Sequence, residues 1–139
     1  MSRKGFTIIE VLTVALIIGL LAVFVVPRMF RGLGEAKRGI AKSKMAIIEG
    51  GLVKFQYHCG RVPNDSEGLE ALLEAPSDLE EKWNGPYLKK SDLLDPWGNP
   101  YIYVEEGMYN PGSFDLISFG ADKVEGGEEK TENEDIYND

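Results

Sequence analysis

The sequence is poor in the residues that build catalytic sites and disulfide frameworks. Its 139 residues include one cysteine, Cys59, and one histidine, His58. A single cysteine cannot form an intramolecular disulfide, so disulfides do not hold this fold together. Neighbouring residues on a helix or strand point in different directions, so His58 and Cys59 do not form a nucleophile–base pair. We therefore expect a protein that is not an enzyme, in which Cys59 has a structural role.

Positive charge is also scarce. The chain has 15 lysines and arginines against 23 acidic residues, which gives a formal net charge of −8. Proteins that bind nucleic acid need a basic face, so we expect no nucleic-acid partner. The basic residues gather between Arg28 and Lys44, whereas the segment from Asp122 to Asp139 is rich in acids. An acidic end of this kind is usually solvated, and we expect residues 132–139 to be partly frayed unless a metal ion draws Asp135 in.

One long apolar run stands near the start of the chain. It extends from Phe6 to Val26 and contains a single charged residue, Glu10. A helix of this length measures about 31 Å, which matches the hydrocarbon core of a bilayer. Soluble core helices rarely stay apolar on all sides for so long. The run therefore predicts a membrane-spanning helix.

Three kinds of N-terminal segment compete for this run. A cleaved signal peptide fits the basic residues Arg3 and Lys4, but the run is too long and ends without a small-residue cleavage site. A plain signal anchor, carrying a periplasmic binding domain and keeping Met1–Gly5, fits the length. It gives no reason for Glu10, because a charge inside an apolar span is costly and usually functional.

The string KGFTIIE, from Lys4 to Glu10, resembles the processing site of type IV prepilins and type II secretion pseudopilins. The resemblance implies cleavage by a prepilin peptidase between Gly5 and Phe6, followed by N-methylation of Phe6. Glu10 would then lie one turn from the new ammonium group, where opposite charges attract strongly in a low dielectric. Its partner could be the ammonium of the same subunit or of a neighbouring one, in which case the pair would set the axial register of assembly.

These expectations divide the chain into three parts. Residues 1–5 form a leader peptide, residues 6–29 a transmembrane and filament-core helix, and residues 30–139 a periplasmic domain. The implied location is the inner membrane, crossed once. Lysines and arginines are more numerous after the run than before it, which by itself predicts the opposite orientation. The resemblance is preferred because the peptidase site must face the cytoplasm.

Gly19 and Pro27 mark a weak stretch within this helix. Proline removes one backbone donor and kinks or breaks a helix, and glycine lowers helix propensity. Relatives carry the same residues at these places, and their filaments can lose helical structure between them. The segment Gly19–Pro27 is therefore expected to be flexible, with a simple kink as the alternative.

Beyond Pro27 the pattern predicts one more stretch of helix and a hairpin. Apolar or small residues recur at helical spacing and indicate a buried stripe made of Leu33, Ala36, Ile40, Ser43, Ile47, Gly51 and Phe55. This helix should end between residues 57 and 60. A short helix is expected over residues 66–75, and two strands over 101–104 and 113–118 should pair as an antiparallel hairpin. The aromatic residues between prolines and glycines are expected to fix loops to the core.

Four segments make the resemblance more specific: CGRVPNDSEGLEALLEAP, WNGPYLKK, DPWGNPYIY and FDLISFGAD occur in that order. They are similar to the protein G family of type II secretion pseudopilins, over essentially the whole chain. The resemblance implies an α+β fold, with a long N-terminal hydrophobic helix packed on a small antiparallel sheet and a calcium-stabilised C-terminal loop. It also implies a structural subunit that polymerises into a periplasmic pseudopilus and drives export of folded proteins across the outer membrane.

The implied partners are further copies of the chain, minor pseudopilins, the inner-membrane assembly platform, the prepilin peptidase and membrane lipid. The alternative is a type IV pilin-like subunit of a surface or DNA-uptake filament. Such pilins usually close their C-terminal loop with a cysteine pair, which is impossible here.

The calcium ion is expected between Ser118 and Asp135. Calcium prefers six to eight oxygen ligands from carboxylates and backbone carbonyls. An acid-rich loop with little apolar surface is costly to order, so a structural dication would offset both its charge repulsion and its entropy. A second acid is expected to complete the site together with Asp122, and two residues are candidates for it. The resemblance implies the candidate ligands Phe119, Asp122, Val124 and Gly127, completed by either Glu129 or Asp135. The alternative is a solvated acidic loop without a metal ion.

Overall fold

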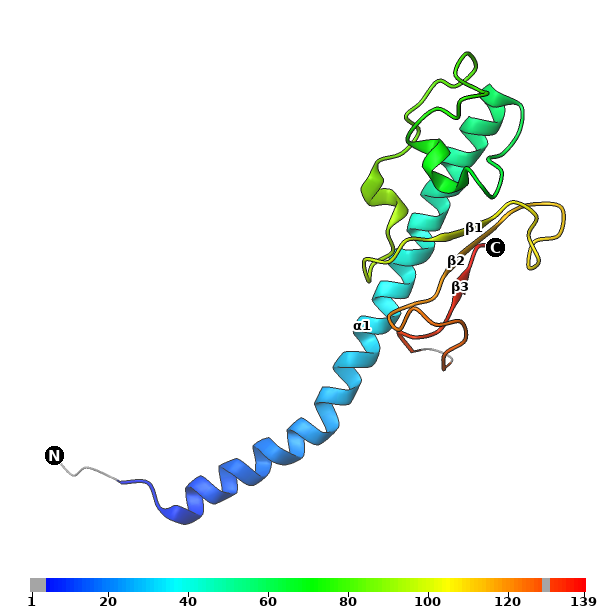
Figure 1. The fold of residues 1–139 in the computed structure, drawn as a ribbon. Coiled ribbons are helices and arrows are strands. Elements are labelled where there is room, and N and C mark those ends of the chain that lie inside the picture. The colour runs from blue at the N-terminus through cyan, green and yellow to red at the C-terminus, as the bar shows by residue number, and fades with distance from the viewer. Residues whose placement is uncertain (1–4, 129–130) are drawn as a thin grey trace. The chain divides into compact units, whose positions relative to one another are not determined.

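The computed structural model describes residues 5–128 and 131–139 (Figure 1). Backbone contacts divide the chain into two compact units, Met1–Gly34 and Glu35–Asp139. The helices are the α-helix α1 and the 3₁₀ helices η1 and η2, with bounds Ile8–Cys59, Gly68–Leu72 and Lys90–Leu93. The strands are β1, β2 and β3, with bounds Ile102–Val104, Asp115–Ser118 and Ile136–Tyr137.

Within the second unit, α1 supplies one wall of the hydrophobic core. Its buried residues recur in steps of four and three, so they share one face. They are Ala41, Met45, Ile48, Leu52, Phe55 and Cys59. Gly60, with a φ of +81°, follows the last turn and donates its N–H to the carbonyl of Gln56 at 2.8 Å, so α1 ends where the sequence predicts.

The stripe predicted from the sequence is wrong over most of its length. Gly51 and Phe55 are buried, but Leu33, Ile40 and Ile47 are half-exposed. Two apolar rows with the same three–four spacing run along this helix, and the sequence pattern selects the row that the domain leaves outside. The row with the larger side chains fills the core because it buries more apolar area.

The segment between α1 and the sheet wraps the core with aromatic side chains, as predicted. Trp83 donates its indole N–H to the carbonyl of Ala71 at 2.8 Å, and the hydroxyl of Tyr101 reaches the carbonyl of Ala41 at 2.9 Å. The short helix expected over residues 66–75 is a 3₁₀ helix of five residues. It begins at Gly68, whose φ of +57° favours glycine.

The predicted hairpin is confirmed. β1 and β2 are antiparallel, with Ile102 opposite Ile117 and Val104 opposite Asp115. Leu116 on β2 is fully buried against the core that α1 lines. In Figure 1 the sheet lies beside the cyan and green turns of α1.

The C-terminal tail is ordered, so the expectation that it frays is wrong. β3 pairs with β2 and completes the sheet in the order β1-β2-β3. Ile136 is only 2% exposed, and Asn138 exchanges hydrogen bonds with the backbone of Leu116. Basic side chains of α1 also face the acidic tail, since Arg38 pairs with Glu134 at 2.9 Å. Apolar burial and charge pairing together hold the tail in place.

Candidate functional site

The first turn of α1 is closed by a reciprocal cap between Thr7 and Glu10. The carboxylate of Glu10 accepts the backbone N–H of Thr7 at 2.8 Å and its hydroxyl at 2.9 Å. The hydroxyl of Thr7 in turn accepts the N–H of Glu10 at 3.3 Å. This capping box satisfies donors that the helix itself leaves free. The pattern Thr-x-x-Glu before an apolar run signals it, and the sequence analysis missed Thr7.

The predicted cleavage point lies just before this cap. Gly5 and Phe6 precede α1 and lie outside any helix or strand, and Phe6 is 88% exposed. Cleavage there would place the new amine one residue from Thr7 and four residues from Glu10. The described geometry thus holds the carboxylate at the very start of the helix, where a positive group would meet it.

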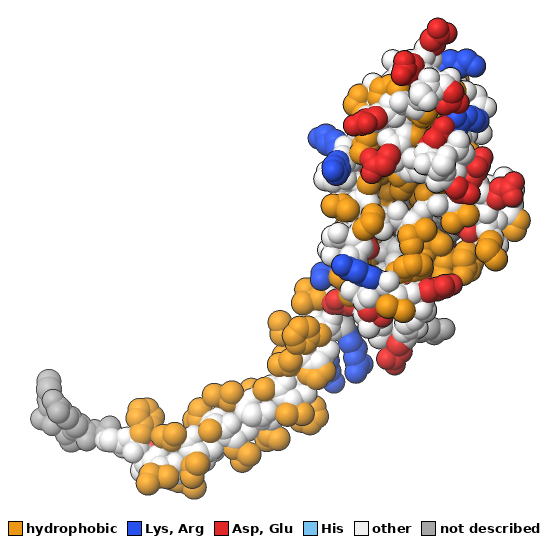
Figure 2. All heavy atoms as spheres, viewed as in Figure 1, with side chains coloured by type: hydrophobic (Ala, Val, Ile, Leu, Met, Phe, Trp, Pro, Cys, Tyr) orange, Lys and Arg blue, Asp and Glu red, His pale blue; other side chains and the backbone are white. Residues whose placement is uncertain are grey.

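The next five turns of α1 are apolar and exposed. α1 is the one helix among the described residues that is long and apolar enough to cross a membrane. Figure 2 shows apolar side chains along the visible face of this N-terminal stretch. Exposed apolar surface of this extent is rare on soluble proteins and marks a membrane or protein contact.

Gly19 and Pro27 both lie inside α1. The helix does not end at Pro27, although proline contributes no N–H to the helical ladder. The hydrogen bonds of the surrounding turns maintain the helix here. The flexibility expected between these two residues stays a prediction about the assembled state.

In the C-terminal loop, Asp135 is tied to Gly126. The N–H of Gly126 donates to one carboxylate oxygen of Asp135 at 2.7 Å, and the N–H of Asp135 donates to the carbonyl of Gly126 at 3.2 Å. The hydroxyl of Tyr137 reaches the same carboxylate oxygen at 3.2 Å. The other carboxylate oxygen, Oδ1, is buried and has no hydrogen-bond partner among the described residues. A buried, unpaired anionic oxygen is what a cation would satisfy.

The other predicted ligands are less well defined as a binding site than Asp135. Asp122 is exposed, and its carboxylate accepts the N–H of Val124 at 3.2 Å. Phe119 is half-buried, and Glu129 lies outside the described residues. Within the described ranges, no three acidic, cysteine or histidine side chains gather into a metal cluster. Besides carboxylates, calcium accepts backbone carbonyl oxygens as ligands.

Two glycines bring such carbonyls close. A side chain at Gly127 would collide with the carbonyl oxygen of Asn133, and one at Gly120 would meet the carbonyl of Glu132. Both glycines have positive φ, at +100° and +68°. The loop therefore folds back on itself tightly, with carbonyl groups packed against glycine backbone. These carbonyls belong to Glu132 and Asn133 rather than to the predicted donors Phe119, Val124 and Gly127, and that of Glu132 accepts the N–H of Ala121 at 2.8 Å.

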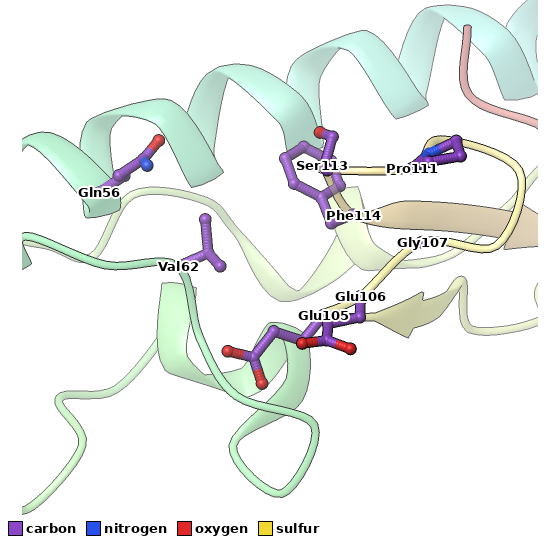
Figure 3. A pocket seen from close by; sticks show the side chains of 9 residues that line it. Gln56, Val62, Glu105, Glu106, Gly107, Pro111, Ser113 and Phe114 are labelled. Carbon is purple, nitrogen blue, oxygen red and sulfur yellow. The ribbon is translucent and has the colours of Figure 1, made fainter.

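A hollow of about 670 Å³ lies between the end of α1 and the β1–β2 connection (Figure 3). Its lining combines Val62 and Phe114 with the acids Glu105 and Glu106.

His58 and Cys59 both interact with the side chain of Tyr87. His58 Nδ1 lies 3.0 Å from the hydroxyl of Tyr87. Cys59 is buried in the core, and this burial raises the pKa of its thiol, which opposes formation of a reactive thiolate.

Comparison with known proteins agrees with these features. The sequence model of the family described as type II secretion system (T2SS), protein G, matches residues 28–139. The chain is 40% identical over 129 residues to the type II secretion system core protein G of Pseudomonas aeruginosa, covering 91% of this chain and 89% of that protein. It is 35% identical over 134 residues to the protein of the same name from Escherichia coli, covering 95% and 91%.

The fold also matches a solved structure. The crystal structure of the major pseudopilin from the type 2 secretion system of enterohaemorrhagic Escherichia coli superposes with a TM-score of 0.59 at 29% identity. The match covers 75% of this chain and 87% of that one. The chain therefore belongs to the protein G family of the type II secretion system, the major pseudopilins, which are pilin-like structural subunits of the pseudopilus and not enzymes.

Proposed function

We propose that this chain is held in the inner membrane by residues 6–29, with residues 30–139 in the periplasm. The observation that carries this proposal is the exposed apolar stretch of α1 whose single charge, Glu10, is placed in the capping box at its first turn. A charge at the end of a span lies near the polar interface, where its cost is smallest. The same stretch would leave the lipid when the subunit enters a filament.

Processing prepares the chain for assembly. The peptidase cuts between Gly5 and Phe6, and the new terminal amine is methylated. The capping box keeps the Glu10 carboxylate at the first turn, close to where that amine forms. Pairing between the amine and Glu10, within one subunit or between two, then sets the axial register.

The processed subunit polymerises with its own copies and with minor pseudopilins on the inner-membrane assembly platform. The resulting periplasmic filament drives export of folded proteins across the outer membrane. Flexibility between Gly19 and Pro27 lets α1 adapt as it passes from lipid into the filament.

The mass of the intact chain tests this proposal first. The full-length protein is isolated from membranes of a host that contains an active prepilin peptidase. Loss of Met1–Gly5 together with one added methyl group is expected. A full-length mass in the presence of active peptidase would contradict the proposal and favour a signal-anchored domain.

Calcium is proposed as a structural ion of the loop Ser118–Asp135. The buried Asp135 oxygen that has no hydrogen-bond partner among the described residues supports it. Asp122 and Asp135 would supply carboxylate oxygens, and Phe119, Val124 and Gly127 backbone carbonyls. The ion would neutralise the acidic loop and hold it in shape for contact with neighbouring subunits.

A further inference from the structure

The basic residues that follow the apolar stretch of α1 fall into two groups. Four of them have partners within the domain, either acids of the C-terminal tail or backbone carbonyls, and these are Lys37, Arg38, Lys42 and Lys44. Arg28 and Arg31 are exposed, and within the described ranges their side chains form no ion pair or hydrogen bond. Two guanidinium groups are therefore free to bind a group outside the chain.

Arg28 and Arg31 lie where the apolar stretch ends. Counted from Ile8 at 1.5 Å per residue, they stand about 30 and 35 Å along α1. The hydrocarbon core of a bilayer is about 30 Å thick, so a span that begins at Ile8 brings both residues to the opposite headgroup layer. Met29 and Phe30 beside them are 63% and 64% exposed, so apolar surface continues to this depth while the arginine side chains extend to the polar interface.

The two arginines share one face of α1. Residues three positions apart in a helix are neighbours, about 5–6 Å apart between their Cβ atoms, so both side chains can reach the same anion. A guanidinium group holds a phosphate through two parallel hydrogen bonds. Phosphate is also the anionic group that a phospholipid headgroup layer presents at this depth.

The distribution of charge favours an anionic lipid as the partner. Arginines on the translocated side of a span oppose the proposed orientation, and a favourable contact on that side would offset this cost. Residues 35–139 contain 11 lysines and arginines against 22 acids, so an anionic membrane surface repels the domain. Cleavage after Gly5 removes Arg3 and Lys4, which leaves Arg28 and Arg31 as the only lysines or arginines in residues 6–34.

We propose that Arg28 and Arg31 together bind the phosphate of an anionic phospholipid in the periplasmic leaflet of the inner membrane. The inference rests on the proposed function, because it requires the span in the membrane and the domain in the periplasm. The contact fixes the depth of the anchor and holds the acidic domain at a surface that otherwise repels it. Entry of the subunit into a filament then breaks this contact.

The lipid selectivity of the processed chain tests this contact. The protein is isolated from membranes of a host with an active prepilin peptidase and reconstituted into phosphatidylcholine vesicles that contain spin-labelled phosphatidylglycerol or spin-labelled phosphatidylcholine. The wild type should prefer phosphatidylglycerol at least about threefold, and Arg28→Gln/Arg31→Gln should lose this preference. Lys37→Gln/Lys42→Gln is the matched control and should retain it, because acids of the tail already pair with these lysines.

Equal association of both lipids with the wild type, or an equal loss of preference in the two double variants, would overturn the inference. It would also be overturned if Arg28→Gln/Arg31→Gln kept the preference but formed no filaments, since the arginines would then pair with acids of a neighbouring subunit. The mass of each preparation separates this inference from the proposed function. A retained leader contradicts the proposed function and the inference with it, whereas a removed leader without lipid preference contradicts the inference alone.

Discussion

Single side chains organise the connections of this domain, and Asp115 is the clearest case. Its side chain is buried, and its carboxylate accepts the N–H groups of Met108, Tyr109 and Asn110 at 2.7–2.9 Å. Burial raises the pKa of Asp115, but these N–H groups stabilise the anion more, so its pKa lies below the usual value. The carboxylate thus holds the β1–β2 connection closed.

We expect Asp115→Asn to destabilise the full-length protein by about 3 kcal/mol, because hydrogen bonds to a charged acceptor are lost and buried donors remain. Thermal unfolding in detergent measures the change. Asp139→Asn is the matched control, since the Asp139 side chain is 96% exposed and makes only a 3.9 Å ion pair. Similar losses in both variants would contradict the role given to Asp115.

The lowered pKa of Asp115 predicts that the stability of the protein depends on pH. A group whose pKa is lowered on folding adds stability above its unfolded pKa of about 4, and this stability is lost as the pH falls through the folded value. The wild-type protein should therefore lose stability below about pH 4. Asp115→Asn should lose less over the same range, which unfolding curves at several pH values would show.

Within α1, the core row and the exposed row differ sharply in their expected contribution to stability. Ile48 is fully buried and Ile47 is 51% exposed, although the two are adjacent and chemically identical. Ile48→Ala should cost about 3 kcal/mol, because it leaves a cavity in the core. Ile47→Ala should cost less than about 1 kcal/mol. Equal losses, measured by thermal unfolding, would show that α1 packs on the domain through a different face.

The burial of the third strand leads to a comparable prediction, although this strand is short. β3 has two residues, and Ile136 is 2% exposed whereas Ile102 on β1 is 36% exposed. Ile136→Ala should therefore destabilise the protein by about 2–4 kcal/mol, and Ile102→Ala by less than half as much. A small effect of Ile136→Ala would mean that the tail is not part of the core.

Sequence patterns anticipated the elements that have a strong local signal. The span after Phe6 follows from a long apolar run, and the hairpin of β1 and β2 follows from two short strand-like segments joined by residues 105–112. The buried face of α1 did not follow, because Ile47 and Ile48 each belong to a regular row of apolar or small residues and only the tertiary fold selects between the two rows. β3 was missed since Ile136 and Tyr137 are too few to show a period and follow several acids.

The candidate functional site was likewise predictable from the sequence in one part and not in the other. The motif around Gly5 and Glu10 is readable because it is local, although the cap from Thr7 went unrecognised. The loop that contains Asp122 and Asp135 depends on turns at glycines with positive φ and on backbone carbonyls. Side-chain patterns carry little information about where carbonyl groups point, so sequence reasoning left two acids as alternatives.

For the complete subunit, calcium is expected to act as a stabilising ligand. A ligand that binds only the folded state raises stability by mass action. The melting temperature of the full-length protein should therefore fall when calcium is removed by a chelator and recover when calcium, but not magnesium, is restored. Asp135→Asn should abolish this shift, while Glu128→Gln, an exposed acid of the same loop, should retain it. A melting temperature that does not depend on calcium would contradict the proposed structural calcium ion.

The place of β3 in the chain has a consequence for when the domain can fold. β3 follows the other described elements along the chain, yet it completes the sheet, and its Ile136 completes the core. Synthesis proceeds from the N-terminus, so α1 and the hairpin are made while their last partner is still missing. The domain reaches its final packing only after β3 has been made and has left the ribosome. Every event that needs the finished domain, including its first encounter with another subunit, waits for these two residues.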